Sequence, residues 1–132
     1  MYRPAIATGA LLAGLAVILG AFAAHALKAR LATDQLAIFE TGVRYHFYHS
    51  FALLITGIMY LSFPNKYVRS ATGFFLAGIA LFSGSLYAMS LLSMSNISIG
   101  PVGIITPIGG LFFILGWLML FLGVVKKDLP RA

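Results

Sequence analysis

The sequence is dominated by four long apolar stretches, each free of Asp, Glu, Lys and Arg. They cover residues 4–26, 45–63, 71–92 and 107–125. A bilayer core about 30 Å thick requires about 20 apolar residues of helix to cross it, and lipid offers no partner for open backbone groups. The pattern therefore predicts an all-α integral membrane protein. We expect a single transmembrane domain over residues 1–132, built as a four-transmembrane-helix bundle.

The composition excludes most soluble classes. Hydrophobic residues make up 61% of the 132 residues and charged residues 9%, whereas a soluble domain typically has about 45–50% and about 25%. The chain lacks the charged surface that a soluble enzyme, a disordered segment or a nucleic-acid-binding domain needs. Cysteine is absent, so disulfides and thiolate metal sites are excluded. The first apolar stretch is long enough to span, which favours a retained helix over a cleaved signal.

Basic residues are divided unequally between the two sides that four spans create. The side of the termini and the middle loop carries Arg3, Lys66, Arg69, Lys126, Lys127 and Arg131, and the opposite side carries Lys28, Arg30 and Arg44. Cytoplasmic loops of membrane proteins collect Lys and Arg. The asymmetry predicts that both termini lie in the cytoplasm.

The connections between the spans differ in composition. Lys28–Arg44 mixes charged and apolar residues, which predicts a short interfacial helix on the outer membrane surface, between the first and second spans. Residues 93–105 are uncharged, and we expect them to form a structured lid in the headgroup layer. Thr106 before Pro107 is typical of a helix start, because a hydroxyl cap precedes a residue that lacks an N–H.

Small residues recur at helical spacing in the first and third spans. The packing candidates are Gly9, Ala13 and Gly20 in the first span, and Gly73, Ala77 and Gly84 in the third. Such a stripe lies on one face of a helix and lets two backbones approach closely in lipid. We therefore expect helices one and three to pack against each other. The alternative is that Gly and Ala are simply frequent in membrane helices.

Polar side chains near the outer ends of the first two spans form the candidate site. The ligand-binding candidates are His25, Glu40, Arg44, Tyr45 and His49. Tyr45 and His49 are four residues apart and share a helix face, and His25 ends the preceding span at a similar depth. Ionisable side chains inside membranes are costly, so each one is a functional hypothesis.

Several interpretations of this cluster remain open. Imidazole binds Zn, Cu and Fe and titrates near neutral pH, so a metal site, a haem held by two imidazoles and a proton relay are functional alternatives. The structural alternative is that these side chains hydrogen-bond to one another and anchor helix ends. There is no HExxH motif and no carboxylate pair on a membrane helix, so the sequence presents no catalytic constellation.

The fourth span offers a second candidate. Phe112, Phe113 and Trp117 would line a binding groove, although packing in the core is the competing interpretation. Gly109 and Gly110 lie near the start of this span and would allow another backbone to approach closely. We expect that backbone to belong to the third loop, residues 93–105.

Four segments carry a family resemblance: GAFAAHAL (Gly20–Leu27), FETGVRYHFYHSFALL (Phe39–Leu54), LFSGSLYAMSL (Leu81–Leu91) and ITPIGGLFFILGW (Ile105–Trp117). Together they resemble the small four-span bacterial membrane proteins of the YgdD and YwdK type, catalogued as a domain of unknown function. The resemblance implies a protein of the bacterial cytoplasmic (inner) membrane and supplies no activity or cofactor. It places His25, Glu40, Tyr45 and His49 on matching motif positions. His46 departs from the family pattern, which weakens any scheme that needs three histidines.

From these features we predict a non-enzymatic membrane bundle, without a cofactor, that binds a lipid-like small molecule or a membrane partner protein. The expected partners are membrane lipids and a second copy of the chain or another membrane protein, and no nucleic acid. One alternative is a haem- or metal-binding redox subunit that uses His25 with His49. Another is an oligomeric transporter of protons or a small solute, because four spans leave little room for a pathway within one monomer.

Overall fold

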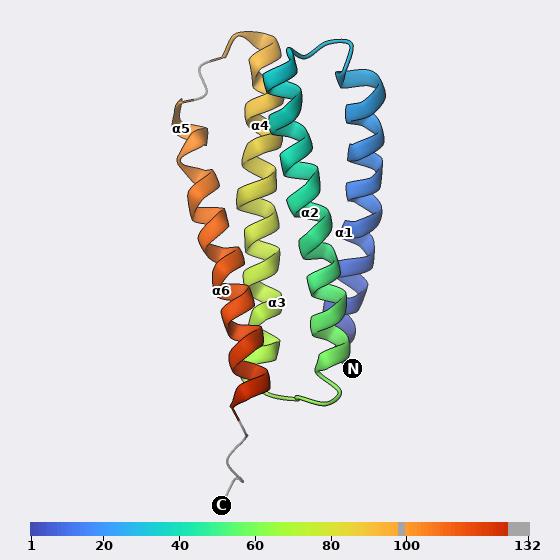
Figure 1. Ribbon diagram of the computed structural model, residues 1–132, viewed down its shortest axis with the longest axis vertical. Coiled ribbons are helices and arrows are strands. Elements are labelled where there is room, and N and C mark those ends of the chain that lie inside the picture. Colours follow the sequence, from blue (N-terminus) through green and yellow to red (C-terminus); the bar gives the residue numbers. More distant parts are fainter. Residues whose placement is uncertain (98–99, 127–132) are drawn as a thin grey trace, which may run out of the picture.

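The computed structural model describes residues 1–97 and 100–126, and every regular element in this part of the chain is helical (Figure 1). The elements are α1 (Arg3–Phe22) with a π-helical turn η1 (Ala23–Leu27); α2 (Thr33–Met59); α3 (Lys66–Gly78), a π-helical turn η2 (Ile79–Ser83), α4 (Gly84–Leu92) and a 3-10 turn η3 (Ser93–Ser95); α5 (Gly100–Gly103); and α6 (Ile105–Val125). The run from α3 to η3 is continuous, and we call it the α3–α4 rod.

The helices stand side by side, with α1 against α2, α2 against the α3–α4 rod, and that rod against α6 (Figure 1). Each runs antiparallel to the one before it. The start of α1, the end of α6 and the connection at residues 60–65 therefore lie at one end, which we call the terminal end. The connection at residues 28–32 lies at the other, the far end. This arrangement at one end of the bundle is the one that the predicted order of four spans requires.

Among the described residues, three stretches are long and apolar enough to cross a membrane: Arg3–Leu27, Lys66–Ser95 and Gly100–Val125, with 25, 30 and 26 residues. Within the described residues, α2 is not among them although it has 27 residues. Its first half carries Asp34, Glu40 and Arg44, which lowers its apolar content.

Large apolar side chains cover the outside of the bundle. Leu11 of α1 is 74% exposed and Ile114 of α6 is 65% exposed. Apolar surface of this extent is a mark of contact with a membrane or a partner rather than with water. The outer faces of α1 and α6 are therefore suited to hydrocarbon.

The predicted interfacial helix between the first two spans is wrong. Residues 33–44 form the first turns of α2, and only residues 28–32 connect η1 to it. Phe39 is 1% exposed, and a Cβ added to Gly42 would come within 2.8 Å of the Tyr87 ring of α4. Burial of Phe39 and the close contact at Gly42 hold this segment inside the bundle instead of on the membrane surface.

The predicted lid at residues 93–105 is mostly short helical turns in its described part. Ser93–Ser95 forms η3, and Asn96 ends it in the left-handed conformation with φ of 53°. Gly100–Gly103 forms α5 directly before α6. Residues 98 and 99 of this predicted loop lie outside the described residues.

Two helix starts differ from the sequence-based boundaries. Thr106 does not cap α6, which begins at Ile105; its hydroxyl lies 2.6 Å from the Ser85 hydroxyl of α4 and so joins two helices. The third helix starts at Lys66 instead of residue 71 because the Asn65 side chain accepts hydrogen bonds from two amides of its first turn, at 3.1 Å each. A capped turn of this kind extends the helix to the edge of the connection.

The predicted packing of helix one against helix three is wrong, because α2 lies between them (Figure 1). A Cβ on Gly9 would come within 2.9 Å of the Ser50 carbonyl oxygen of α2, and Gly20 also faces α2. A Cβ on Gly73 or Gly84 would meet nothing within 4 Å. The remaining packing candidates, Ala13 and Ala77, are half-buried. Gly9 and Gly20 of α1 therefore pack against α2, whereas Gly73 and Gly84 of the third span contact no neighbouring helix.

The close approach that glycine permits lies between α6 and the α3–α4 rod. Three buried glycines of α6 are seven residues apart, and so are the residues opposite them: Gly109 faces Phe82, Gly116 faces Phe75, and Gly123 faces Val68. A seven-residue repeat on both helices is typical of knobs-into-holes packing. The close approach predicted at Gly109 is therefore made to the backbone of Phe82 in η2 and not to the third loop.

Candidate functional site

His49 lies in the middle of α2 and is 5% exposed. Its Nδ1 donates to the Tyr45 carbonyl oxygen at 2.7 Å, and its Nε2 accepts from the indole Nε1 of Trp117 on α6 at 3.2 Å. A carbonyl only accepts hydrogen bonds and an indole N–H only donates them. These two partners therefore select the neutral imidazole with its proton on Nδ1, and they engage both ring nitrogens.

Aromatic rings enclose this imidazole. The Phe113 ring of α6 stacks on it, with ring centroids 3.5 Å apart and planes at 8°. Phe75 of α3 and Trp117 approach more steeply, at centroid distances of 5.7 Å and 6.1 Å. His49 is thus a polar ring in an aromatic cage that α3 and α6 contribute.

A groove with a volume of about 610 Å³ opens beside the cage, between α2 and α6. Its lining residues are Tyr45 and His49 of α2, Phe82 of η2, and Pro107, Gly110, Leu111, Phe113, Ile114 and Trp117 of α6. We call it the His49 groove. Ligand pockets are typically about 300–1,000 Å³, mostly apolar, with a few polar groups that fix orientation. The His49 groove has the dimensions and the chemistry of such a pocket.

Only two of the five predicted ligand-binding residues line this groove. Tyr45 and His49 lie together, whereas His25, Glu40 and Arg44 are exposed. Within the described residues, no hydrogen bond or ion pair joins those three side chains to Tyr45 or His49. His25 belongs to η1 at the end of α1. The helix α1 packs against α2, whereas α6 packs against the α3–α4 rod. The fold does not assemble the five side chains into one site.

His46 serves a different helix contact from His49. It is 2% exposed, and its Nδ1 lies 3.0 Å from the Tyr87 hydroxyl of α4. The two histidines are three residues apart, yet one joins α2 to α4 and the other joins α2 to α6. Among the described residues, no three His, Asp or Glu side chains come together in a way that would hold a metal ion.

His49 fits a haem- or metal-ligand role poorly. Metal coordination requires a free nitrogen lone pair, and the one on Nε2 accepts the Trp117 indole hydrogen. His25, the second ligand that the alternative requires, lies on η1 and not on a helix that lines the groove. Coordination by this pair would require both the hydrogen bond and the helix packing to change.

The groove predicted on the fourth span is present in part. Phe113 and Trp117 line the His49 groove, and Trp117 is 46% exposed there. Phe112 instead contacts Phe74 of α3, with ring centroids 6.0 Å apart. The sequence did not single out Phe82, because it lies in an apolar run whose spacing does not distinguish it from its neighbours.

Comparison with known proteins identifies relatives along most of the chain. Residues 19–110 match the family described as "Protein of unknown function (DUF423)". The chain is 43% identical to the UPF0382 membrane protein YwdK of Bacillus subtilis, over 92% of this chain and 95% of the relative. It is 41% identical to the UPF0382 membrane protein SAB0533 of Staphylococcus aureus, over 92% and 94%. A UPF0382 membrane protein of Haemophilus influenzae is 41% identical over 84% and 85%. No solved structure matches the chain.

Proposed function

The chain belongs to the DUF423 (UPF0382) family of membrane proteins, and we propose that it is a non-enzymatic four-span bundle that holds a lipid-like small molecule in the His49 groove. It is an all-helical, multi-pass membrane protein. The observation that carries the proposal is a laterally open aromatic groove with one buried, doubly hydrogen-bonded histidine in its wall.

The direction of the chain supports α2 as a membrane span in addition to the three apolar stretches. Both α1 and the α3–α4 rod run from the terminal end to the far end (Figure 1). If both of these apolar helices cross the membrane, the chain must return across it between them, and α2 is the segment that does so. Its polar residues His46 and His49 are buried against neighbouring helices, so they do not face lipid.

The distribution of cations supports a cytoplasmic terminal end. Among the described residues this end carries Arg3, Lys66, Arg69 and Lys126, whereas Lys28, Arg30 and Arg44 belong to the far half. Loops that stay in the cytoplasm collect Lys and Arg. Together with the bacterial relatives, this asymmetry supports the cytoplasmic membrane as the location.

The lining chemistry supports a lipid-like occupant. Leu111 and Ile114 provide an apolar wall on α6, and both are about half exposed, at 54% and 65%. The Tyr45 hydroxyl is the polar group left for a ligand once His49 and Trp117 satisfy each other. An amphipathic molecule with a long apolar body and a small polar head matches this combination.

The same lining supports binding over catalysis, haem ligation or proton transport. The groove contains no Asp, Glu, Lys or Arg among its lining residues. Acid–base chemistry and proton relays need titratable groups that can exchange protons with substrate or with one another. The one imidazole in the groove is held by partners on both nitrogens.

Native mass spectrometry of the gently solubilised full chain tests the proposal. The wild type is expected to retain one small amphipathic molecule. Gly110→Leu is expected to lose it, because the new side chain fills the groove, while its Cβ meets the Phe82 ring only at an ordinary 3.7 Å. Gly84→Leu is the matched control, since its Cβ meets nothing within 4 Å and Gly84 does not line the groove.

A wild-type protein that retains no small molecule contradicts the proposal. So does equal retention by Gly110→Leu and the wild type. A Soret band or stoichiometric metal that disappears in His49→Ala would replace it with the haem or metal alternative.

A further inference from the structure

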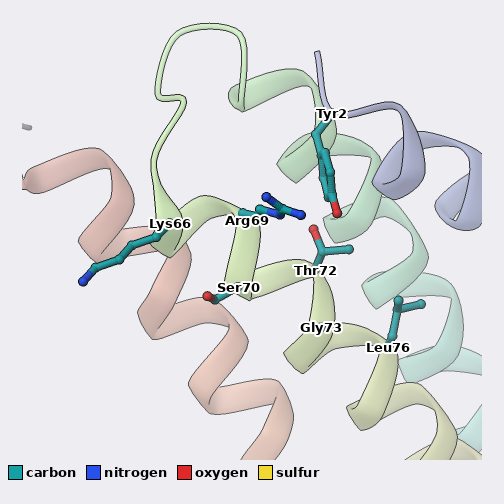
Figure 2. Close-up of a pocket in the computed structure, with 7 residues that line it drawn as sticks. All are labelled: Tyr2, Lys66, Arg69, Ser70, Thr72, Gly73 and Leu76. Atoms are coloured by element: carbon teal, nitrogen blue, oxygen red, sulfur yellow. The ribbon is translucent and has the colours of Figure 1, made fainter.

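A second pocket lies at the terminal end, away from the His49 groove. It has a volume of about 420 Å³ and opens between the start of α1 and the first turns of α3 (Figure 2). Its lining residues are Tyr2, Lys66, Arg69, Ser70, Thr72, Gly73 and Leu76. Two of these are cations, and three carry hydroxyl groups. We call it the Arg69 pocket.

Thr72 is the anomaly in this pocket. Thr8, Thr41 and Thr56 each donate to the carbonyl four residues earlier, at 2.8, 2.9 and 2.7 Å, as threonines in helices commonly do. Thr72 also lies inside a helix and is only 6% exposed, yet its hydroxyl has no hydrogen-bond partner. Figure 2 shows this hydroxyl turned toward the Tyr2 hydroxyl and the Arg69 guanidinium. A buried polar group without a partner is costly, so a missing partner is the simplest explanation.

Tyr2 is fixed in place beside it. Its backbone N–H donates to the Gly57 carbonyl oxygen of α2 at 2.9 Å, and its ring lies 5.5 Å from that of Tyr60. The Arg69 guanidinium carbon lies 5.7 Å from the Tyr2 ring centroid. Three hydrogen-bonding groups therefore converge. Because Arg69 is exposed, a rotation of its side chain would open the Thr72 hydroxyl to a ligand atom.

The charge around the pocket calls for an anion. Arg69 and Lys66 line it, and Lys66 points outward in Figure 2, where it adds to the field without closing the pocket. Asp34 and Glu40, the acids of the described residues, lie in the first half of α2 toward the far end. An arginine guanidinium together with hydroxyl donors is a characteristic phosphate-binding set.

The lower part of the pocket is apolar and open. Gly73 leaves space at the surface of α3, since a Cβ there would meet nothing within 4 Å, and Leu76 follows one turn later. A phosphate at Arg69 would thus have an apolar track running from it along the helix. Basic pockets between membrane helices on the cytoplasmic side are suited to anionic lipid headgroups.

We propose that the Arg69 pocket binds an anionic phospholipid, whose phosphate accepts hydrogen bonds from Arg69, Tyr2 and Thr72 while an acyl chain lies over Gly73 and Leu76. This site is independent of the proposed ligand of the His49 groove. The bound lipid would connect the start of α1 with α3 at the terminal end of the bundle.

The test is lipid titration of the full chain in detergent, read by native mass spectrometry, with phosphatidylglycerol and with phosphatidylcholine of the same acyl chains. Phosphatidylglycerol is expected to bind more tightly. Arg69→Gln should weaken it about 10-fold, since a charge-assisted bond is lost, and Thr72→Val about 3-fold. Arg44→Gln, at an exposed arginine of α2 outside the pocket, is the matched control and should leave binding unchanged.

Thr72→Val also separates binding from folding. The hydroxyl has no partner in the lipid-free protein, so the unfolding temperature without lipid should stay the same or rise, whereas stabilisation by phosphatidylglycerol should shrink. Equal binding of the two lipids, unchanged binding in both pocket variants, or an equal loss in Arg44→Gln would overturn the proposal. Displacement of phosphatidylglycerol by millimolar inorganic phosphate would assign the pocket to free phosphate and overturn the lipid assignment.

Discussion

Polar side chains inside the helices satisfy most of their hydrogen bonds within one helical turn. Ser50 donates to the His46 carbonyl oxygen at 2.8 Å, and Thr56 donates to that of Ala52 at 2.7 Å. This is what hydrocarbon demands, because lipid supplies no hydrogen-bond partner. A residue that also bonds across helices, such as His49 with Trp117, ties the packing of two helices to one polar contact.

The His49–Trp117 hydrogen bond is expected to stabilise the protein measurably. Trp117→Phe removes the donor and leaves the buried Nε2 acceptor without a partner, so the free energy of unfolding should fall by about 1–2 kcal/mol. Chemical unfolding in detergent measures the change. In a His49→Phe background the same substitution should cost less, because the acceptor is already gone. An equal cost in both backgrounds would show that the indole contributes only packing.

Of the individual residues in the candidate site, the sequence predicted only those that lie on one helix. The four-residue spacing of Tyr45 and His49 places both on one face of α2, and both line the groove. Trp117 lies 68 residues further along the chain. Helical spacing relates residues within one helix, so it cannot say which residue of another helix meets His49. The same limit explains why His25 was grouped with His49 although it lies on η1.

Pairs of helices in this protein are matched by shape more than by polar contacts. Along α6, glycines at seven-residue intervals accept Phe82, Phe75 and the side chain of Val68 from the α3–α4 rod. In lipid, the association of helices depends on van der Waals contact, and a missing Cβ brings two backbones together. The packing of α6 against the α3–α4 rod therefore depends on the absence of side chains at these glycines.

Gly109 and Gly110 should respond very differently to the same substitution. A Cβ on Gly109 would come within 2.7 Å of the Phe82 Cα, and backbone cannot rotate away; a Cβ on Gly110 would meet only the edge of the Phe82 ring at 3.7 Å. Gly109→Ala should therefore lower the free energy of unfolding by about 1–3 kcal/mol through overpacking. Gly110→Ala should be neutral or stabilising, because alanine favours a helix. Equal unfolding curves for the two variants would contradict the close packing of Gly109 against the Phe82 backbone.

Helix boundaries were the least predictable property of the elements. The charges of residues 28–44 indicated a helix on the membrane surface, but residues 33–44 continue into α2 because Phe39 and Gly42 dock against α4. A charge pattern reports which side chains prefer water. It does not report whether a neighbouring helix offers a surface that buries the other face.

The whole molecule is an alternating series of helices whose two ends differ in charge. The terminal end carries the start of α1, the end of α6 and the connection at residues 60–65, and the far end carries the connection at residues 28–32 (Figure 1). If α2 crosses the membrane, these two connections lie on opposite sides. If it does not, they lie on the same side.

Cysteine labelling in intact cells separates these arrangements. The chain has no cysteine, so Ala29→Cys and Ser62→Cys, both at exposed positions, each provide a unique thiol. A membrane-impermeant maleimide should label Ala29→Cys from outside and should label Ser62→Cys only after the cells are opened. Labelling of both from outside would contradict α2 as a span, and the opposite pattern would invert the proposed orientation.

The amino-acid sequence alone is enough to identify a helical membrane protein, because long stretches without charge are unfavourable in water and helices close their own hydrogen bonds in lipid. The order of the apolar stretches also predicted that the first helix begins, and the last helix ends, at the same end of the bundle. Which helices touch could be learned only from the packed bundle, in which α2 separates α1 from α3 and His49 meets Trp117. Apolar side chains have little preference among neighbours in hydrocarbon, so that choice depends on the fit of surfaces such as Gly109 against Phe82.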